Sequence, residues 1–228
     1  MLIYLDNSAT TAQRREVTET MLSAMENTYG NPSSLHRMGV EAEKLVKASR
    51  KAISASLGVS EDEIYFTSGG TESDNTAILG ACAALKRSGS HIITTAIEHP
   101  AVLECFRKLE SEGFSVTYLS PDRNGIVSAE KVRSALREDT ILVSVMHVNN
   151  ETGAIQPVEE IGALLSGREH TVFHCDAVQS FGKIPVPVRA AGIGALSASG
   201  HKIHGPKGVG ILFVDHNMRI VPYMIGGG

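Results

Sequence analysis

The stretch SASGHKIHGPKGVG at residues 197–210 places two histidines and two lysines among glycines, between two apolar runs. Lys202 is the residue of most chemical interest, because it directly follows a short apolar stretch that is typical of a buried strand. A lysine that is partly withdrawn from water and lies near other cations has a lowered pKa, and its neutral amine is a nucleophile. For Lys202, as for Lys207 five residues later, the simpler interpretation is a solvated side chain. The choice between them depends on what lies near Lys202.

Four other segments with polar or acidic side chains follow strand-like apolar runs. They are SGGTES (68–73), EHP (98–100), NNETG (149–153) and DAVQS (176–180). In open α/β sheets, binding sites form outside the carboxyl ends of the strands, where the loops lead into helices. We therefore expect these segments and the Lys202 loop to meet at one edge of a sheet.

The SGGTES segment is a candidate anion site. Its glycines, Gly69 and Gly70, permit a tight turn, and Thr71 begins a helix whose free N–H groups favour an anion. The spacing and the lysine of a P-loop are absent. A helix start that is capped by its own threonine, serine and glutamate side chains explains the segment equally well.

The other polar residues also allow two interpretations each. Asp176 directly follows a buried strand, so its carboxylate needs a cationic or hydrogen-bonding partner, although a helix N-cap is the simpler role. Asn150 and Gln179 carry amides that suit the fixing of a ligand oxygen but also ordinary loop hydrogen bonds. His99 is a candidate for proton transfer, and a lone histidine is more often a capping or surface residue.

The apolar pattern alternates between strand-like and helix-like segments, which predicts a single α/β domain. Predicted strands are 63–67, 91–95, 114–119, 140–148, 171–174, 195–199 and 209–214. Predicted helices cover 71–86, 101–109, 128–136 and 158–165, with two more around residues 17–25 and 42–53. Nearly continuous apolar strands that are separated by helices indicate a three-layer fold, with a mostly parallel sheet and helices on both faces.

The composition excludes several classes of function. The chain has 228 residues and a formal net charge of −4, from 21 basic and 25 acidic residues, so it has no basic surface for nucleic acid or an anionic membrane. No apolar run approaches the length of a membrane span, and the start MLIYLDNSATT lacks the features of a secretion signal. Cys82, Cys105 and Cys175 are odd in number and have no metal-ligand spacing, so we expect no metal site and a cytoplasmic protein.

Taken together, the candidate residues match the parts that hold pyridoxal phosphate. A lysine forms the Schiff base, an aspartate pairs with the pyridine nitrogen, a helix start binds the phosphate and a histidine faces the ring. The segments YLDNSATT, YGNPSSLH, FTSGGTESDN, TTAIEHPAVLE, VNNETGAIQP, HCDAVQSFGKIP, SGHKIHGPKGVG and the closing GGG extend this match along the chain. With these segments the chain resembles the cysteine desulfurases of the NifS and IscS type, which are class V, fold type I pyridoxal phosphate enzymes.

The resemblance implies a role for each candidate residue. Lys202 would carry the cofactor and move the substrate Cα proton, Asp176 would pair with the pyridine nitrogen, and His99 would stack on the ring. The phosphate would be bound by Gly70, Thr71, Ser199 and His201, and the phenolic oxygen or the substrate by Asn150 and Gln179. The family usually has alanine at the position of Gly70, and a main-chain contact would survive that difference at some cost in loop rigidity.

The resemblance also implies that residues 1–228 are the large cofactor-binding domain, with an N-terminal arm and helix at about 1–30. A smaller C-terminal domain, a substrate-binding arginine and a mobile loop with the nucleophilic cysteine would follow Gly228 and are absent. Cys82, Cys105 and Cys175 have the apolar surroundings of structural cysteines, so none is expected to replace that nucleophile.

Implied partners are L-cysteine, a second copy in a homodimer and a sulfur acceptor or iron-sulfur scaffold protein. Two alternatives stay open: a pyridoxal phosphate protein that does not remove sulfur, and a scaffold that retains the fold without the cofactor.

Overall fold

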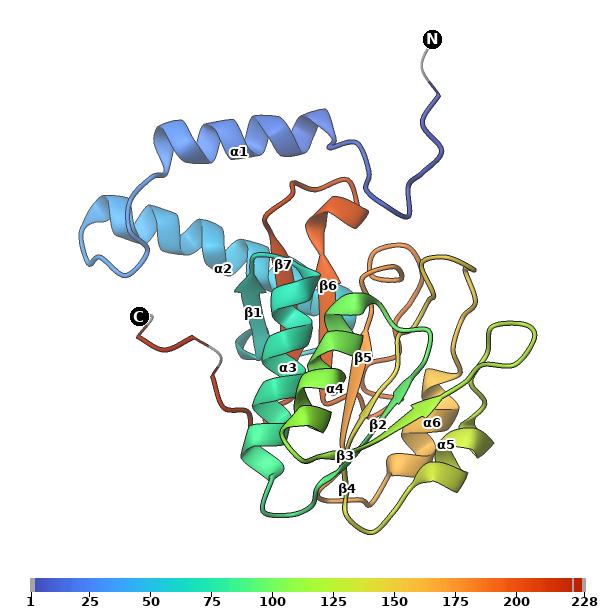
Figure 1. Cartoon of the computed structure of the whole chain (residues 1–228). Helices are drawn as coiled ribbons and strands as arrows, with labels where there is room; N and C mark the ends of the chain where they lie inside the picture. Colours follow the sequence, from blue (N-terminus) through green and yellow to red (C-terminus); the bar gives the residue numbers. More distant parts are fainter. Residues whose placement is uncertain (1–2, 223, 227–228) are drawn as a thin grey trace.

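The computed structural model describes residues 3–222 and 224–226, and its centre is a seven-stranded sheet (Figure 1). Along the sheet the strands lie in the order β1-β7-β6-β5-β4-β2-β3. Their bounds are β1 Ile64–Thr67, β2 His91–Thr95, β3 Ser115–Leu119, β4 Thr140–Ser144, β5 Val172–Asp176, β6 Ala195–Ser199 and β7 Gly210–Val214. The neighbours from β6 to β3 pair in parallel, and β7 is antiparallel to both β6 and β1. The predicted mostly parallel sheet is thus confirmed.

Helices cover both faces of the sheet, as the alternation of apolar residues predicts. On one face, α3 (Gly70–Leu85) and α4 (Pro100–Ser111) pack on a core that includes Ile92. On the other face, α5 (Ala129–Ala135) and α6 (Val158–Leu165) pack on a core that includes Ile93. Because successive residues of a strand point to opposite faces, β2 contributes to both cores. The three-layer α/β fold is confirmed.

The N-terminal part of the chain lies beside this sandwich rather than within it (Figure 1). Helix α1 (Arg15–Asn27) has no buried residue, and Met25 is 63% exposed. Helix α2 (Arg37–Leu57) buries only a few side chains, including Leu57 in the core of the α5–α6 face, and ends at Gly58 in the left-handed conformation. Both helices were predicted from their apolar periodicity, but most of that apolar surface is not buried among the described residues.

A close main-chain approach brings the start of α3 to the β6–β7 connection. A Cβ atom on Gly210 would lie 2.6 Å from the Cα atom of Gly69, so a side chain at that position is excluded. Gly69 itself has φ of +156° and ends the turn from β1 into α3. The short helical turn η2 (Gly200–Lys202) follows β6 at the same edge. The sequence SGG in one segment and GVG in the other therefore place the anion-site candidate beside the Lys202 loop.

Most predicted element bounds hold to within one or two residues; α2 is longer at both ends than the predicted 42–53, and the strand predicted for 140–148 is shorter. The assigned strand β4 ends at Ser144, although the amides of Val145 and His147 still donate to the main-chain oxygens of His174 and Asp176. Glu63 belongs to the short helix η1 (Glu61–Glu63) instead of a strand. Strand β5 extends to Asp176, two residues beyond the prediction. Gly227 and Gly228 of the closing GGG lie outside the described residues.

Among the described residues, the longest helices carry too many polar side chains to cross a membrane.

Candidate functional site

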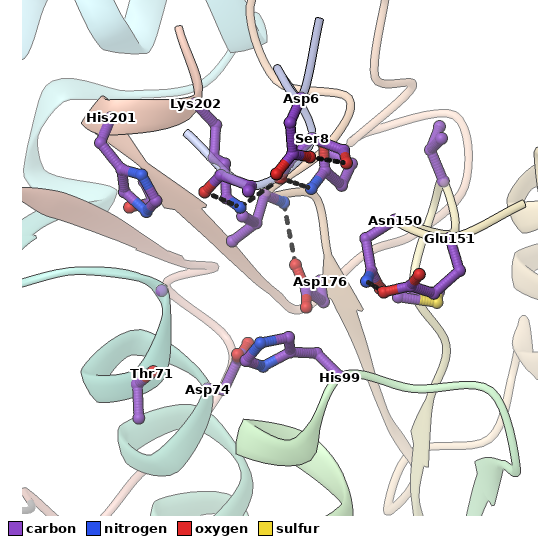
Figure 2. Close-up of a pocket in the computed structure, with 17 residues that line it drawn as sticks. Asp6, Ser8, Thr71, Asp74, His99, Asn150, Glu151, Asp176, His201 and Lys202 are labelled. Carbon is purple, nitrogen blue, oxygen red and sulfur yellow. Dashed lines mark hydrogen bonds between the residues drawn. The ribbon is translucent and has the colours of Figure 1, made fainter. Parts of the chain in front are cut away.

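A cavity of about 640 Å³ lies at the carboxyl edge of the parallel strands, and all nine predicted site residues line it. They come from five separate connections, and two of them, Asp176 and Ser199, are the last residues of β5 and β6; Figure 2 shows the labelled side chains. The nine are Gly70, Thr71, His99, Asn150, Asp176, Gln179, Ser199, His201 and Lys202. The predicted convergence of the loops is confirmed, whereas the chemical role of each residue stays a prediction.

Asp176 is the last residue of β5 and is 5% exposed. One carboxylate oxygen, Oδ1, accepts a 2.8 Å hydrogen bond from the amide of Val178. Burial raises the pKa of this carboxyl group, and the Val178 amide, His99 and Lys202 oppose that rise. A cationic group bound in the cavity would offset the remaining free-energy cost of burying the ionised Asp176 carboxylate.

Lys202 reaches the same cavity from η2. Its Nζ atom donates to the main-chain oxygen of Ala9 at 2.8 Å, and also to that of Ser8. Partial burial and the positive charge of Lys183 lower the pKa of Lys202, while Asp176 and Asp6 act in the opposite direction. Lys202 is thus partly buried and lies near another cation, in agreement with the predicted environment, while its chemical role stays a prediction.

The start of α3 has the features of an anion site. Within the described part of the chain, no side chain caps the helix: its N-cap residue is Gly69, and Glu72 accepts a hydrogen bond from the amide of Ser68 instead. The alternative of a fully self-capped helix start therefore does not account for the N–H groups of the first turn. Thr71, Ser199 and His201 line the cavity around this helix end and offer hydroxyl and imidazole groups to an anion.

His99 has both of the roles considered for it in the sequence. It is the N-cap of α4, and its Nδ1 atom accepts a 3.1 Å hydrogen bond from the amide of Ala101. The ring also lines the cavity, and in Figure 2 it lies on the side of Asp176 that faces α3. The capping bond fixes the ring orientation, so that one aromatic face is available to a ligand.

The two amide side chains at the cavity wall are hydrogen-bonded to neighbouring groups. Asn150 donates to the carboxylate of Glu151 at 2.6 Å. Gln179 donates to the main-chain oxygen of Ser8 at 2.8 Å and accepts from Lys183 at 3.2 Å. Both residues lie where the prediction places them, and each would exchange a present partner on contacting a ligand.

Several cavity residues were not predicted. The N-terminal segment contributes Asp6, Ser8 and Ala9, and α3 contributes Asp74. The segment YLDNSATT is part of the family resemblance, but nothing local in it indicates a contact with residues almost two hundred positions later. For Asp74 the sequence offers only a weak signal, an aspartate about one turn inside the predicted helix at 71–86, because an aspartate near a helix start is usually exposed.

The donor set fits pyridoxal phosphate. The uncapped helix start and its hydroxyls suit a phosphate, the buried Asp176 carboxylate suits a protonated ring nitrogen, and the Lys202 amine suits a carbonyl carbon. A Cβ atom on Gly70 would lie 2.7 Å from Cγ2 of Val178, so this cradle has little space for a larger residue.

The three cysteines do not contribute to the cavity. All three are buried: Cys82 and Cys105 in the core between α3, α4 and the sheet, and Cys175 on the opposite face from Asp176. Burial raises the pKa of Cys82 and of Cys105 to about 12, and raises that of Cys175 as well. A buried thiol of this kind is a poor nucleophile. The prediction that they are structural agrees with this placement.

Comparison with known proteins gives consistent similarities along the chain. Residues 3–228 match the aminotransferase class-V family. The cysteine desulfurase IscS of Methanosarcina thermophila is 49% identical over 99% of this chain and 55% of its own length.

Two solved structures are similar over the whole chain. A NifS-like protein has a TM-score of 0.96 at 42% identity, with 63% of its length covered. The structure of SspA in complex with cysteine has a TM-score of 0.94, also at 42% identity, with 66% of its length covered. The chain spans 55–59% of the length of the curated relatives that it matches.

Proposed function

The chain belongs to the aminotransferase class-V family, and from this premise we propose that it is the cofactor-binding part of a pyridoxal-phosphate-dependent cysteine desulfurase. In this proposal residues 1–228 form the large domain, with the N-terminal arm and α1 at about residues 1–30. The reaction is the conversion of L-cysteine to L-alanine, with the sulfur passed on as a persulfide. The names of the relatives, cysteine desulfurase IscS and NifS-like protein, support this choice within the family.

The observation that carries the proposal is the meeting of Lys202, Asp176 and the uncapped start of α3 around one cavity. These groups come from three distant parts of the sequence. Each has a chemical property that the cofactor requires: an amine of lowered pKa, a buried carboxylate without a full complement of partners, and free helix N–H groups. We would not expect an ordinary surface cleft to combine such an amine, carboxylate and helix start.

We assign the following tasks to the chain's own residues. Asp176 holds the ring nitrogen of the cofactor in its protonated form, and Thr71, Ser199 and His201 bind the phosphate with the main chain of Gly70. His99 packs on the ring, while Asn150 and Gln179 orient the phenolic oxygen or the substrate. When bound, pyridoxal phosphate supplies an aromatic system that can take up the negative charge developing at the substrate Cα atom.

Lys202 has the central task in the proposed reaction. Its Nζ atom would hold the cofactor covalently, and as a free amine it would be the group that accepts the proton from the substrate Cα atom. For this step the amine must be neutral, and its lowered pKa favours the neutral form. The carbonyls of Ser8 and Ala9 provide a position in which the released amine, once protonated, can be held beside the cavity.

Removal of sulfur requires an accessible thiol, and the burial of all three cysteines favours a second candidate for the isolated chain. In that candidate the chain binds the cofactor and exchanges the Cα proton of amino acids without releasing sulfur. The two candidates share the residues of the cavity and differ only in the fate of the substrate sulfur.

The proposal extends to partners and location. L-cysteine is the proposed substrate, and the structure of SspA with cysteine is a precedent among the similar proteins. A homodimer, a sulfur acceptor or iron-sulfur scaffold protein, and a cytoplasmic location follow from the proposed family role.

The test uses the purified chain with added pyridoxal phosphate. We expect a visible absorption band of the bound cofactor, and borohydride followed by peptide mass analysis should place the cofactor on Lys202. Lys202→Ala should lose the band, whereas Lys207→Ala should keep it. Sulfide release from L-cysteine then separates the candidates: we expect little from the chain alone. Absence of the band in the unsubstituted chain would contradict both candidates.

A further inference from the structure

A buried carboxyl group lies beneath the cavity and has no role in the function proposed above. Asp74, on α3 one turn beyond Gly70, is 1% exposed and lines the cavity (Figure 2). Its Oδ1 atom is buried without a hydrogen-bond partner among the described residues. Leaving an ionised oxygen in this state is costly, because desolvation of a charge requires a cation or several hydrogen bonds in return.

The contacts of Asp74 are all with uncharged groups. The hydroxyl of Ser197 hydrogen-bonds to the carboxyl group, and the Nε2 atom of His174 lies 3.5 Å from Oδ1. His174 is itself fully buried and places its two ring nitrogens on hydroxyls, at 2.8 Å from Ser144 Oγ and 3.1 Å from Ser197 Oγ. Burial lowers the pKa of His174 to about 3, so the ring is neutral and offers no positive charge to Asp74.

The other titratable groups around Asp74 would repel a negative charge. Asp176 lies on β5 and Glu98 follows β2, and both carboxyl groups oppose ionisation of Asp74. Burial raises the pKa of Glu98 to about 8. Strands β4, β6 and β7 carry no titratable side chain. The remaining titratable groups on the elements packed against α3 are His174 and Cys175 on β5, the exposed Tyr65 on β1, and those of α4 with its N-cap. The last set comprises His99, the buried Cys105 and the exposed Glu104, Arg107, Lys108 and Glu110.

We propose that Asp74 is a positioning residue that is held as a neutral acid in the folded protein. The negative charge at the cavity is then carried by the carboxylate of Asp176. Two uncharged side chains beside Asp74, Ser197 and His174, also flank Asp176 across or along the sheet: Ser197 is the register partner of Asp176, and His174 is two residues earlier on the same strand. A proton on Asp74 therefore removes one negative charge from the immediate surroundings of Asp176.

A neutral Asp74 also favours the binding of an anion at the start of α3. The group sits one turn inside the helix whose first N–H groups face the cavity, and a carboxylate there would repel an anion at the helix start. This part of the inference rests on the proposed function, because it assumes that the anion is the cofactor phosphate. The protonation of Asp74 itself can be measured in the protein without any ligand.

The first test compares the unfolding temperatures of the unsubstituted protein and Asp74→Asn over pH 5 to 8, with no ligand added. If the folded protein keeps the proton on Asp74, its free energy of unfolding falls as the pH rises above the pKa of an unfolded aspartate, near 4. Asparagine is an uncharged near-isostere, so Asp74→Asn does not show this fall. We expect the unfolding temperature of Asp74→Asn to rise relative to the unsubstituted protein by about 2–4 °C for each pH unit.

The matched control is Glu138→Gln, which removes one exposed carboxyl group and should show no such trend. A constant or falling difference for Asp74→Asn would overturn the proposal. A second measurement needs no substitution: the carboxyl carbon of Asp74, observed by NMR with labelled aspartate, should keep the chemical shift of the acid at pH 7. The shift of a carboxylate at pH 7 would overturn the proposal even if Asp74→Asn failed to fold.

The ligand test follows the absorption band of bound pyridoxal phosphate at pH 7. Asp74→Asn should bind the cofactor with the same affinity to within a fewfold change and with the same band position, because it replaces one neutral group with another. A loss of about tenfold or more would show that the charge of Asp74 is required and would overturn the inference. If neither protein binds the cofactor while the NMR shift reports an acid, the proposed function fails and the protonation of Asp74 stands.

Discussion

The Nζ atom of Lys202 donates a 2.8 Å hydrogen bond to the main-chain oxygen of Ala9, 193 residues earlier in the chain. This contact is part of a set of bonds between the N-terminal segment and the Lys202 loop. The amide and the hydroxyl of Thr11 both donate to the main-chain oxygen of His201, at 2.9 and 2.8 Å, and the amide of His204 donates to the Thr11 hydroxyl at 2.7 Å. Thr11 thus fixes the segment that provides two acceptors for the Lys202 amine.

Thr11→Val should loosen this attachment. The substitution preserves the shape of the side chain but leaves the amide of His204 and the oxygen of His201 with fewer partners, at a cost of about 1 kcal/mol. We expect the His204 amide to exchange its hydrogen about tenfold faster in the variant. Thr20→Val, which removes an exposed hydroxyl that bonds only within α1, is the control. Unchanged exchange at His204 would contradict this account of Thr11.

Gly70 and Val178 should be energetically coupled. In Gly70→Ala the new Cβ atom would lie 2.7 Å from Cγ2 of Val178, and overpacking of this kind costs about 1–3 kcal/mol. In a Val178→Ala background the contact is removed, and alanine in place of glycine then stabilises the helix by up to about 1 kcal/mol. We expect a coupling free energy of about 1–2 kcal/mol from the double-mutant cycle, measured by denaturant unfolding. Additive changes in the free energy of unfolding would show that the Val178 side chain moves away from the new Cβ atom without loss of stability.

Arg189 should be the most sensitive surface-accessible residue for stability. Its guanidinium bonds to Asp215 at 2.5 Å and to Glu63, whose side chain is 1% exposed, and it lies over the ring of Phe213. Arg189→Ala leaves the Glu63 carboxylate buried without this partner. We expect a loss of roughly 2–3 kcal/mol in the free energy of unfolding, near the low end for buried pairs because Arg189 is 44% exposed.

The control for Arg189 is Arg133→Ala, which breaks an exposed pair with Glu130 and should cost less than about 0.5 kcal/mol. Equal effects of the two substitutions would mean that the Glu63 pair contributes no more than a surface ion pair.

His174 should contribute to instability in acid. Its pKa in the folded protein is about 3, below the ordinary value of 6.5, because the ring is buried. Between these values the unfolded chain binds the proton and the folded protein does not, so stability falls as pH decreases from 6.5 towards 3. In His174→Gln the slope between pH 6 and 4 should decrease by about 1.4 kcal/mol per pH unit. His170→Gln, at an exposed position, should leave the slope as it is; an unchanged slope in His174→Gln would contradict the prediction.

The sequence was sufficient to predict the sheet, its covering helices and the nine residues that share the cavity. Apolar periodicity defines the elements, and the carboxyl-edge rule places their loops together, whereas Ser199 and His201 were included among the nine because of the family resemblance. The N-terminal contribution of Ser8 and Ala9 was not predictable, because main-chain oxygens carry no residue-specific signal. Asp74 was missed because an aspartate near a helix start is usually exposed, and only the tertiary fold shows that this one is covered by β5 and β6.

The end of the predicted strand at 140–148 illustrates a different limit. The residues after Ser144 remain apolar and still bond to β5, but Val148 pairs with Ile155 in an isolated bridge and the chain turns towards Asn150. The apolar pattern continues to Val148 through Val145 and Met146, and the polar residues His147 and Asn149 are also buried there. Their burial depends on hydrogen bonds such as that from Asn149 Nδ2 to the oxygen of Ile97, which no local pattern reveals.

Strand β1 lies at the edge of the sheet and has β7 as its single neighbour, so β1 cannot pair during synthesis until β7 has been made. Ile64 emerges long before its register partner Phe213, so the nascent chain must carry β1 unpaired while the parallel strands are still being synthesised. The hairpin from β6 to β7 contains Lys202 and closes the gap, and it is translated late. A polypeptide released before β7 would therefore expose the edge of β6 and leave β1 unpaired, and both can pair with other unfolded chains. It would also lack the strand that anchors the lysine loop.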